Sequence, residues 1–341
     1  MLISKTNTKP KMNTLTFPIL RMLADGRFHS GEDIAQHFKV SRTTVWNAMR
    51  EAEALGVQIF SVRGRGYRLP EPIQLLEREV VLEAIGEQRA WFKLEVHDHL
   101  ESTNSYLMKL AAQNAPHASC VAASLQTKGR GRRGRTWQAG LGASLTFSLL
   151  WRFQSGAAAL SGLSLAVGVA LIRAMRSLGL SEMQLKWPND LVVHHQGRHH
   201  KLAGILIELQ GDMEGPSAAV IGIGINLRLP EQVKQHIDQP AIDIAALSEH
   251  WRDPSQLLGL MLRHLADALS TFEQQGFSAM HGEWTGYHAY QNQTVRMLLP
   301  DGRETQGVAR GVAEDGILLV ETAAGVQRFS AGEISLRGVT S

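Results

Sequence analysis

Near the N-terminus, apolar positions recur at helical spacing in three successive short segments. The first spans residues 15–24, the second follows the capping sequence Ser30-Gly31-Glu32-Asp33, and the third starts at Ser41. Apolar residues at every third or fourth position place one face of a helix against a core. Two short runs around a glycine-rich turn, Ile59–Val62 and Tyr67–Leu69, then predict a hairpin. Three helices and a hairpin over residues 13–69 are typical of a winged helix-turn-helix.

From about residue 73 to residue 290, strand-like and helix-like patterns alternate. Short apolar or alternating runs predict strands at Ser144–Trp151, Met183–Trp187, Leu191–His194, Leu202–Leu209 and Ala219–Leu227. Helical periodicity predicts helices at Glu77–Ile85, Ser105–Ala112, Ala158–Leu178 and Ser255–Gln275. This alternation indicates a mixed α/β core built on one large sheet.

After Tyr290 the strands become short and are separated by regular turns, which predicts a small β-barrel. The sequence therefore predicts a multi-domain α+β protein. Its expected parts are a flexible tail (1–12), a winged helix-turn-helix domain (13–69), a mixed α/β domain (70–290) and a small β-domain (291–341).

Composition and charge limit the kinds of partner and the cellular compartment that we expect for this protein. The 341 residues carry a formal net charge of only +3, so any nucleic-acid surface must be local. A single cysteine, Cys120, cannot form an internal disulfide, which favours the reducing cytoplasm. Residues 153–172 carry no charge and could span a bilayer by length. Because they include three serines and three glycines, we expect a buried helix and no membrane association.

Several motifs could carry chemistry, and each also has a purely structural interpretation. Lys128–Arg135 reads KGRGRRGR, which fits a solvated basic loop, a nucleic-acid patch, or a loop that wraps a phosphate-bearing ligand. Ser102-Thr103-Asn104 could cap a helix or bind an anion or amide at its start. Asn189 and Asp190 could form only a turn, or could face Mg²⁺ or a ribose. Lys201 could be a surface lysine at the start of a strand.

The segment Ile221–Asn226 reads IGIGIN, so its isoleucines share one face of a strand and its glycines share the other. A strand with one bare face weakens a sheet unless something packs closely there. A ligand or a packed helix would satisfy this requirement.

The order of these motifs identifies a resemblance. Ser-Thr-Asn, then Gln126 and GRGRRGR followed by Trp137, then KWPND, KLAGILIE and GIGIN, resembles the biotin protein ligases. The winged helix before them and the small barrel after them are similar to the bifunctional ligase and biotin-operon repressor type of bacteria. The resemblance covers roughly residues 15–338, and it implies a class II synthetase-like central domain and an SH3-like C-terminal barrel.

The resemblance also implies which residues act. Lys201 and Arg132 are expected to be catalytic. Biotin is expected to contact Ser102, Thr103, Asn104, Gln126, Arg130, Gly131, Arg132, Lys201, Gly204 and Leu206. ATP and the adenylate are expected to contact Arg130, Arg132, Arg135, Trp137, Asn189 and Asn226. Asp190 is the candidate metal ligand. The family tryptophan that ends the adenine-covering loop is missing, because the comparable stretch here is Gln239-Pro240-Ala241-Ile242.

The implied reaction joins biotin to ATP as biotinyl-AMP and then transfers biotin to a lysine of a carboxylase biotin carboxyl-carrier domain. Biotin, ATP and Mg²⁺ are the expected ligands. Operator DNA and a second copy of the chain, joined in a ligand-promoted homodimer, are the further expected partners. Two other functions fit the pattern: a ligase with an idle DNA-binding module, and a transcription factor that only senses a ligand. Lipoate or octanoate transfer is a third, which KWPND disfavours.

The DNA-binding expectation rests on local charge. Ser41–Arg68 contains five arginines and two glutamates, an excess of +3 (5 − 2). The residues expected to face DNA are Arg42, Thr43, Thr44, Asn47, Arg50, Arg63 and Arg65, with Trp46 and Arg68 beside them.

Overall fold

A computed structural model describes residues 13–138, 140–211, 214–248, 253–298, 303–330 and 335–338. The chain divides into two units. The first runs to Leu75 and includes Gly140–Gly142, and the second contains the remaining residues. The predicted flexible tail, residues 1–12, lies outside the described residues.

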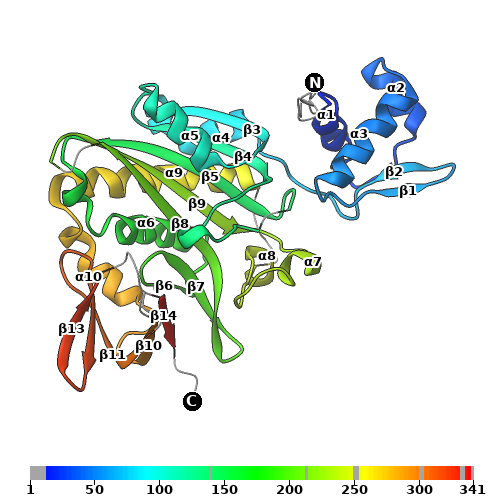
Figure 1. Ribbon diagram of the computed structural model, residues 1–341. Coiled ribbons are helices and arrows are strands. Elements are labelled where there is room, and N and C mark those ends of the chain that lie inside the picture. Colours follow the sequence, from blue (N-terminus) through cyan, green and yellow to red (C-terminus); the bar gives the residue numbers. More distant parts are fainter. Residues whose placement is uncertain are drawn as a thin grey trace, which may run out of the picture. The chain divides into compact units, whose positions relative to one another are not determined.

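The first unit contains the winged helix-turn-helix that the sequence predicts (Figure 1). Its elements are α1 (Thr16–Leu23), α2 (Gly31–Phe38), α3 (Arg42–Ala54), β1 (Phe60–Val62) and β2 (Gly66–Arg68). The Ser30 and Ser41 side chains accept hydrogen bonds from Asp33 N and Thr44 N and so fix where α2 and α3 begin. The core contains Ile19, Leu20, Leu23, Ile34, Val45, Ala48 and Met49.

The second unit is built on a seven-stranded sheet with strand order β3-β4-β5-β9-β8-β7-β6. Its strands are β3 (Lys93–Leu100), β4 (Ser119–Gln126), β5 (Ser144–Phe153), β6 (Met183–Lys186), β7 (Asp190–His195), β8 (Arg198–Gly211) and β9 (Ser217–Asn226). Only β3 and β4 pair in parallel, and the other neighbours are antiparallel. The last five match predicted strands, whereas β3 and β4 were not predicted.

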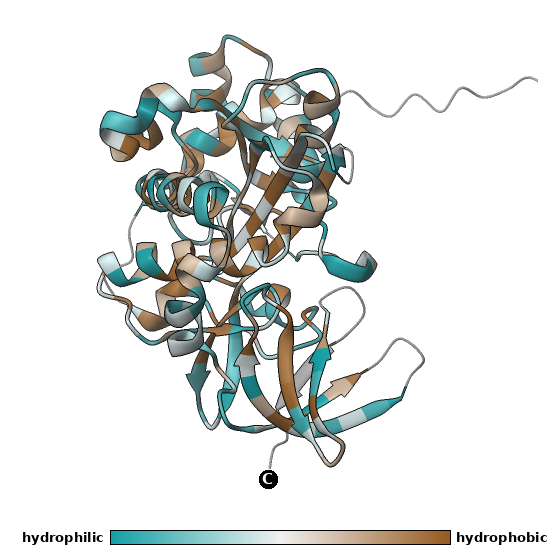
Figure 2. Ribbon diagram, turned by 90° about the vertical axis from the view of Figure 1, so that its left-hand side faces the viewer, coloured by the Kyte–Doolittle hydropathy of each residue, from teal (hydrophilic) through white to brown (hydrophobic). Residues whose placement is uncertain are grey.

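Helices cover both faces of this sheet (Figure 1). One face carries α4 (Arg78–Ile85), α6 (Leu163–Ser177) and α9 (Pro254–Gln275), which pack on Phe147, Ile221 and their neighbours. The other carries α5 (Thr103–Ala112), which packs on Val121, Leu150 and Val220. Figure 2 shows apolar residues concentrated along the strands, with hydrophilic residues on the outer helix surfaces. Because α5 covers only part of its face, the rest of that face is available to loops.

The uncharged stretch 153–172 is divided between three elements. It contains the last residue of β5, a short 3₁₀ turn at Ala157–Leu160, and the first ten residues of α6. The predicted helix at Ala158–Leu178 therefore begins later than expected, at Leu163, because Gly162 has a φ of +80° that a helix cannot continue through. Within the described ranges, no helix has both the length and the apolar character needed to cross a bilayer.

The C-terminal part adds α10 (Ser278–Tyr287) and a five-stranded antiparallel sheet of order β13-β12-β11-β10-β14. The strands are β10 (Thr294–Leu298), β11 (Glu304–Val312), β12 (Leu318–Thr322), β13 (Gly325–Phe329) and β14 (Ser335–Gly338). Val295, Met297, Leu318 and Val320 join the core of the large sheet. The small β-domain therefore packs as part of the second unit.

Candidate active site and DNA-binding surface

On either side of the bare face of β9, the neighbouring strands present mostly polar or small residues. Ser148, Gly222 and Leu206 are in register across β5, β9 and β8, and Thr146, Gly224 and Gly204 follow in the next such row. A Cβ at Gly222 would lie 2.1 Å from Asn104 Oδ1. A Cβ at Gly224 would lie 2.5 Å from the Trp137 ring. The glycines therefore admit one side chain from the start of α5 and one, Trp137, that follows the cationic loop, as we call Lys128–Arg135.

A small cavity of about 60 Å³ lies over this glycine face. It is lined by every residue that the resemblance assigns to biotin: Ser102, Thr103, Asn104, Gln126, Arg130, Gly131, Arg132, Lys201, Gly204 and Leu206. These residues come from positions up to about 100 apart in the chain, and the fold brings all of them to one place.

Buried hydrogen bonds organise the floor of the small cavity. Gln126 Oε1 accepts from Thr103 N at 2.6 Å and from Thr103 Oγ1 at 3.1 Å. Ser148 Oγ lies 2.8 Å from Thr103 Oγ1 and 2.6 Å from Asn104 Oδ1. Sequence reasoning missed Ser148. The available signal was its position among the alternating polar residues of a strand that pairs with the glycine strand.

Asn104 and Arg130 meet at Glu208, the last residue of KLAGILIE, to which the sequence analysis assigned no role. Asn104 Nδ2 donates to Glu208 Oε2 at 3.0 Å and to Leu206 O at 3.2 Å. Arg130 forms a two-pronged ion pair with the same carboxylate, at 2.8 and 3.1 Å. Glu208 therefore connects the floor of the cavity to the cationic loop.

Lys201 forms an ion pair with Asp190 across the hairpin of β7 and β8. Lys201 Nζ lies 2.7 Å from Asp190 Oδ1, and the two side chains are only 18% and 15% exposed. The backbone of Lys201 is held on both sides, since its N–H donates to Pro240 O and its carbonyl accepts from Ile242 N. The candidate metal ligand Asp190 is thus already engaged by a cation. Among the described residues, no group of three or more His, Cys, Asp or Glu side chains could hold a metal ion.

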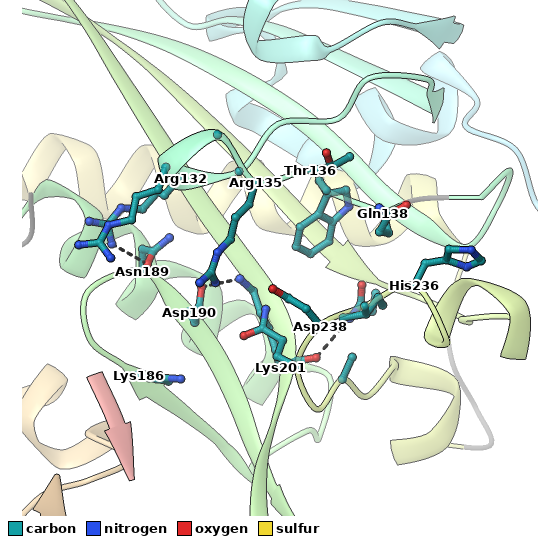
Figure 3. A pocket seen from close by; sticks show the side chains of 18 of the residues that line it. Arg132, Arg135, Thr136, Gln138, Lys186, Asn189, Asp190, Lys201, His236 and Asp238 are labelled. Carbon is teal, nitrogen blue, oxygen red and sulfur yellow. Dashed lines mark hydrogen bonds and ion pairs between the residues drawn. The ribbon is translucent and has the colours of Figure 1, made fainter. Parts of the chain in front are cut away.

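A larger cavity of about 470 Å³ shares Gly131, Arg132, Trp137, Asn189 and Lys201 with the small one. In Figure 3, Arg132 and Arg135 extend from the cationic loop toward Asn189 and Asp190. Arg132 Nη1 donates to Asn189 Oδ1 at 3.1 Å, and Asn189 Nδ2 donates to Ile205 O at 2.7 Å. Burial lowers the pKa of the Arg132 guanidinium, and the neighbouring Arg133 charge acts in the same direction. Cations therefore concentrate at the junction of the two cavities.

The far wall of the larger cavity is the segment after β9. His236, Ile237, Asp238, Gln239 and Ala241 line it, following the short helix α7 (Glu231–Lys234). Asn226 also lines this cavity, but its amide nitrogen donates to Lys201 O and Ile242 O. Asn226 thus attaches the segment to the sheet. Ala241 occupies the place of the expected aromatic residue.

On the first unit, the residues expected to face DNA lie on the outer side of α3 and on the β1–β2 turn. Arg42, Thr43, Trp46, Asn47, Arg50, Arg63 and Arg65 are exposed, and Thr44 is half-buried. The Phe28 ring makes cation–π contacts with two arginines of the β1–β2 hairpin, whose Cζ atoms lie 4.3 Å (Arg65) and 4.9 Å (Arg68) from the ring centre. Arg68 also stacks on Phe60 at 5.3 Å. The aromatic rings hold both guanidinium groups in place.

Comparison with known proteins bears on both units. Residues 96–226 match the model of the biotin/lipoate A/B protein ligase family, residues 16–68 match an HTH domain, and residues 291–337 match the biotin protein ligase C-terminal domain. The bifunctional ligase/repressor BirA of Escherichia coli is 35% identical over 96% of this chain and 98% of that protein. A biotin–[acetyl-CoA-carboxylase] ligase of Paracoccus denitrificans is 30% identical over 70% of this chain and 98% of that protein. The biotin protein ligase of Aquifex aeolicus, solved with biotin and ATP, has a TM-score of 0.61 and 28% identity. It covers 73% of this chain and 100% of its own.

Proposed function

This chain belongs to the biotin protein ligase family, in its bifunctional ligase/repressor branch, and from that membership we propose how its residues divide the work. It is an ATP-dependent biotin ligase with a DNA-binding repressor module. The observation that supports our site assignment is the convergence of all ten expected biotin residues on one cavity that joins a larger, cation-rich cavity. In this scheme residues 13–69 bind DNA, 70–290 carry the reaction and 291–341 complete the second unit.

In the first step, a carboxylate oxygen of biotin attacks the α-phosphorus of ATP. A P–O bond forms, pyrophosphate leaves with the electrons of the broken P–O bond, and biotinyl-AMP remains. Because the attack brings two anions together, fixed cations must offset their repulsion. Lys201 and Arg132 lie where the two cavities meet, so we assign that role to them. Lys201 exchanges its Asp190 partner for the substrate carboxylate.

In the second step, the free amine of a carrier-domain lysine attacks the carbonyl carbon of the anhydride. An amide bond forms, the carbon–oxygen bond to AMP breaks, and the amine loses a proton to solvent. The cationic loop covers the intermediate during the interval between the steps. Exclusion of water by such a loop protects an anhydride from hydrolysis.

Mg²⁺ fits the larger cavity as a companion of the ATP phosphates. Protein sites for Mg²⁺ commonly offer only one or two carboxylates, and phosphate oxygens and water supply the other ligands. Asp190 and Asp238 line this cavity and are the carboxylates that could serve. The ion would neutralise phosphate charge. Whether these two carboxylates hold the ion can be tested by measuring how the rate of the Asp190→Asn and Asp238→Asn variants depends on Mg²⁺ concentration.

Mass spectrometry of a carrier domain incubated with the protein, ATP, Mg²⁺ and biotin tests the ligase assignment directly. The carrier should gain one biotinyl group, and lipoate or octanoate in place of biotin should give no product. A carrier that gains lipoyl but not biotinyl groups would replace biotin with lipoate in the assignment. We place this reaction in the cytoplasm, in keeping with the single buried thiol, Cys120.

For the repressor activity, we propose a homodimer whose formation is favoured by biotinyl-AMP. A single winged helix offers few phosphate contacts, whereas two copies on a two-fold operator can place both α3 helices in major grooves. Sedimentation and a DNA-shift assay on the region upstream of biotin-synthesis genes, with and without biotin and ATP, test this. Equal mass and equal DNA affinity in both conditions would leave a ligase with an idle N-terminal module. DNA binding without carrier labelling would instead indicate a ligand-sensing transcription factor.

A further inference from the structure

Two ion pairs between the cationic loop and the body of the second unit differ in kind. Lys128 pairs with Glu101 at 2.9 Å, and both side chains are more than half exposed. Arg130 pairs with Glu208, whose side chain is 23% exposed, through two parallel contacts. Two-pronged arginine–carboxylate pairs fix orientation as well as distance. The Glu208 contact can therefore hold the loop in one position, which the flexible Lys128 contact cannot.

Glu208 reaches the loop from a strand that lines the small cavity. It stands on β8 two residues after Leu206, so its side chain emerges on the same face of the sheet as Gly204 and Leu206. Both of these residues line the small cavity. From this position the Glu208 carboxylate contacts both Asn104 of α5 and Arg130 of the cationic loop.

The same carboxylate, together with the carbonyl of Leu206, determines which way the Asn104 amide points. Asn104 Nδ2 has two hydrogens, and they go to Leu206 O and to Glu208 Oε2. Its Oδ1 accepts from Ser148, which leaves a second lone pair on that oxygen, and Asn104 lines the small cavity. An amide oxygen held this way can accept a hydrogen bond from an N–H of a bound cyclic urea, whereas a reversed amide would present a second donor.

We propose that Glu208 is a positioning residue that couples closure of the cationic loop to the biotin pocket. It does so by orienting Asn104 for the ligand and by holding Arg130 over it. This inference rests on the proposed biotin ligase function. It assigns to Glu208 no contact with the reacting atoms, so its loss should weaken ligand retention more than it slows chemistry.

The test compares Glu208→Gln with the matched variant Glu101→Gln, which removes the same charge from the exposed Lys128–Glu101 pair. A glutamine oxygen in the place of Oε2 can still accept from Asn104 Nδ2 and Arg130 Nη1, but the NH₂ group in the place of Oε1 cannot accept from Arg130 Nη2, and the negative charge is lost. We expect the KM for biotin to rise about tenfold in Glu208→Gln, the loss expected for one charge-assisted contact, with kcat within about threefold of wild type. Glu101→Gln should change neither constant by more than about twofold.

Trypsin cleavage gives a second readout, because the loop is rich in arginine. Biotin and ATP should slow cleavage of the loop in wild type and in Glu101→Gln, and should protect Glu208→Gln about tenfold less. If thermal melting shows that Glu208→Gln is unfolded, Glu208→Asp is compared instead. That variant keeps the charge but is too short to reach both partners, and should show the same direction of change.

Equal KM values and equal protection in the Glu208 and Glu101 variants would overturn the proposal. A fall in kcat with unchanged KM and protection would also overturn it, since it would give Glu208 a part in the chemistry. Wild-type protein that shows neither biotin binding in calorimetry nor loop protection would instead reject the biotin function itself. The two failures are therefore distinguishable.

Discussion

Gly222→Ala is the sharpest test of the site, because a single methyl group enters the point where the glycine strand meets α5. A Cβ there would lie 2.1 Å from Asn104 Oδ1 and 2.7 Å from its Cγ. Real Cβ atoms do not approach other heavy atoms so closely, so Asn104 must move by about 1 Å or more. The backbone of residue 222 gives no reason for strain, since its φ is not positive.

The cost follows from the contacts that Asn104 makes. A displaced amide loses one or two of its hydrogen bonds to Leu206, Glu208 and Ser148. Each such bond contributes about 1 kcal/mol, and the displaced Oδ1 also no longer lies where we propose that it meets biotin, so we expect a loss of about 1–2 kcal/mol in biotin binding. That energy corresponds to a rise of about 5- to 30-fold in the Kd for biotin. Repacking should also lower the free energy of unfolding by about 1–3 kcal/mol.

The assay is calorimetric titration of biotin together with thermal unfolding. Gly282→Ala in α10 is the matched control, since no atom lies within 4 Å of its added Cβ. It should leave the Kd within about twofold and raise stability slightly, as alanine does in a helix. A double variant, Gly222→Ala with Asn104→Ala, should bind no more weakly than Asn104→Ala alone. Additive losses, or an unchanged Kd in Gly222→Ala, would refute the reasoning.

Four further outcomes are expected. Lys201→Ala should slow pyrophosphate release by about 30- to 1,000-fold, the effect of one charge-assisted contact in a shielded site, while Lys128→Ala changes it little; a rate within about threefold would exclude Lys201 from the mechanism. Arg132→Gly should release biotinyl-AMP, so that bystander proteins become labelled; labelling confined to the carrier domain would show that another group retains the adenylate. Burial lowers the pKa of His288 to about 4, so its unfolded form binds more protons between about pH 6.5 and 4. Stability should be full above pH 6.5 and fall with pH through this window, and the fall should be smaller in His288→Gln, as read from urea unfolding at several pH values. Phe28→Leu should free the Arg65 and Arg68 guanidinium groups and weaken operator binding severalfold, without changing the slope of log affinity against log salt concentration. Arg65→Ala should reduce that slope by about one. Identical slopes for the two variants would argue against a phosphate contact at Arg65.

Much of the fold could be predicted because local sequence patterns determine where many of its helices and strands form. Ser30 and Ser41 stand at helix starts because a serine oxygen can accept a backbone N–H that the first turn leaves unpaired. The five predicted strands of the large sheet are rich in apolar and β-branched residues. Strands β3 and β4 were missed because β3 carries Glu95, His97 and His99 at an edge, and β4 is largely small residues. Helix α10 was missed because Gly282 and Gly286 weaken its helical signal.

The sequence by itself also determined that one face of IGIGIN is bare, because side chains alternate between the two faces of any strand. It could not determine what occupies that face. Asn104 over Gly222, Trp137 over Gly224 and the Asp190–Lys201 pair depend on strand register and loop path. The contacts of Glu208 could not be predicted for the same reason, since it is 78 residues from Arg130 and 104 from Asn104. Contacts at such separations are decided by which strands pair and in what register, and only the tertiary structure settles that.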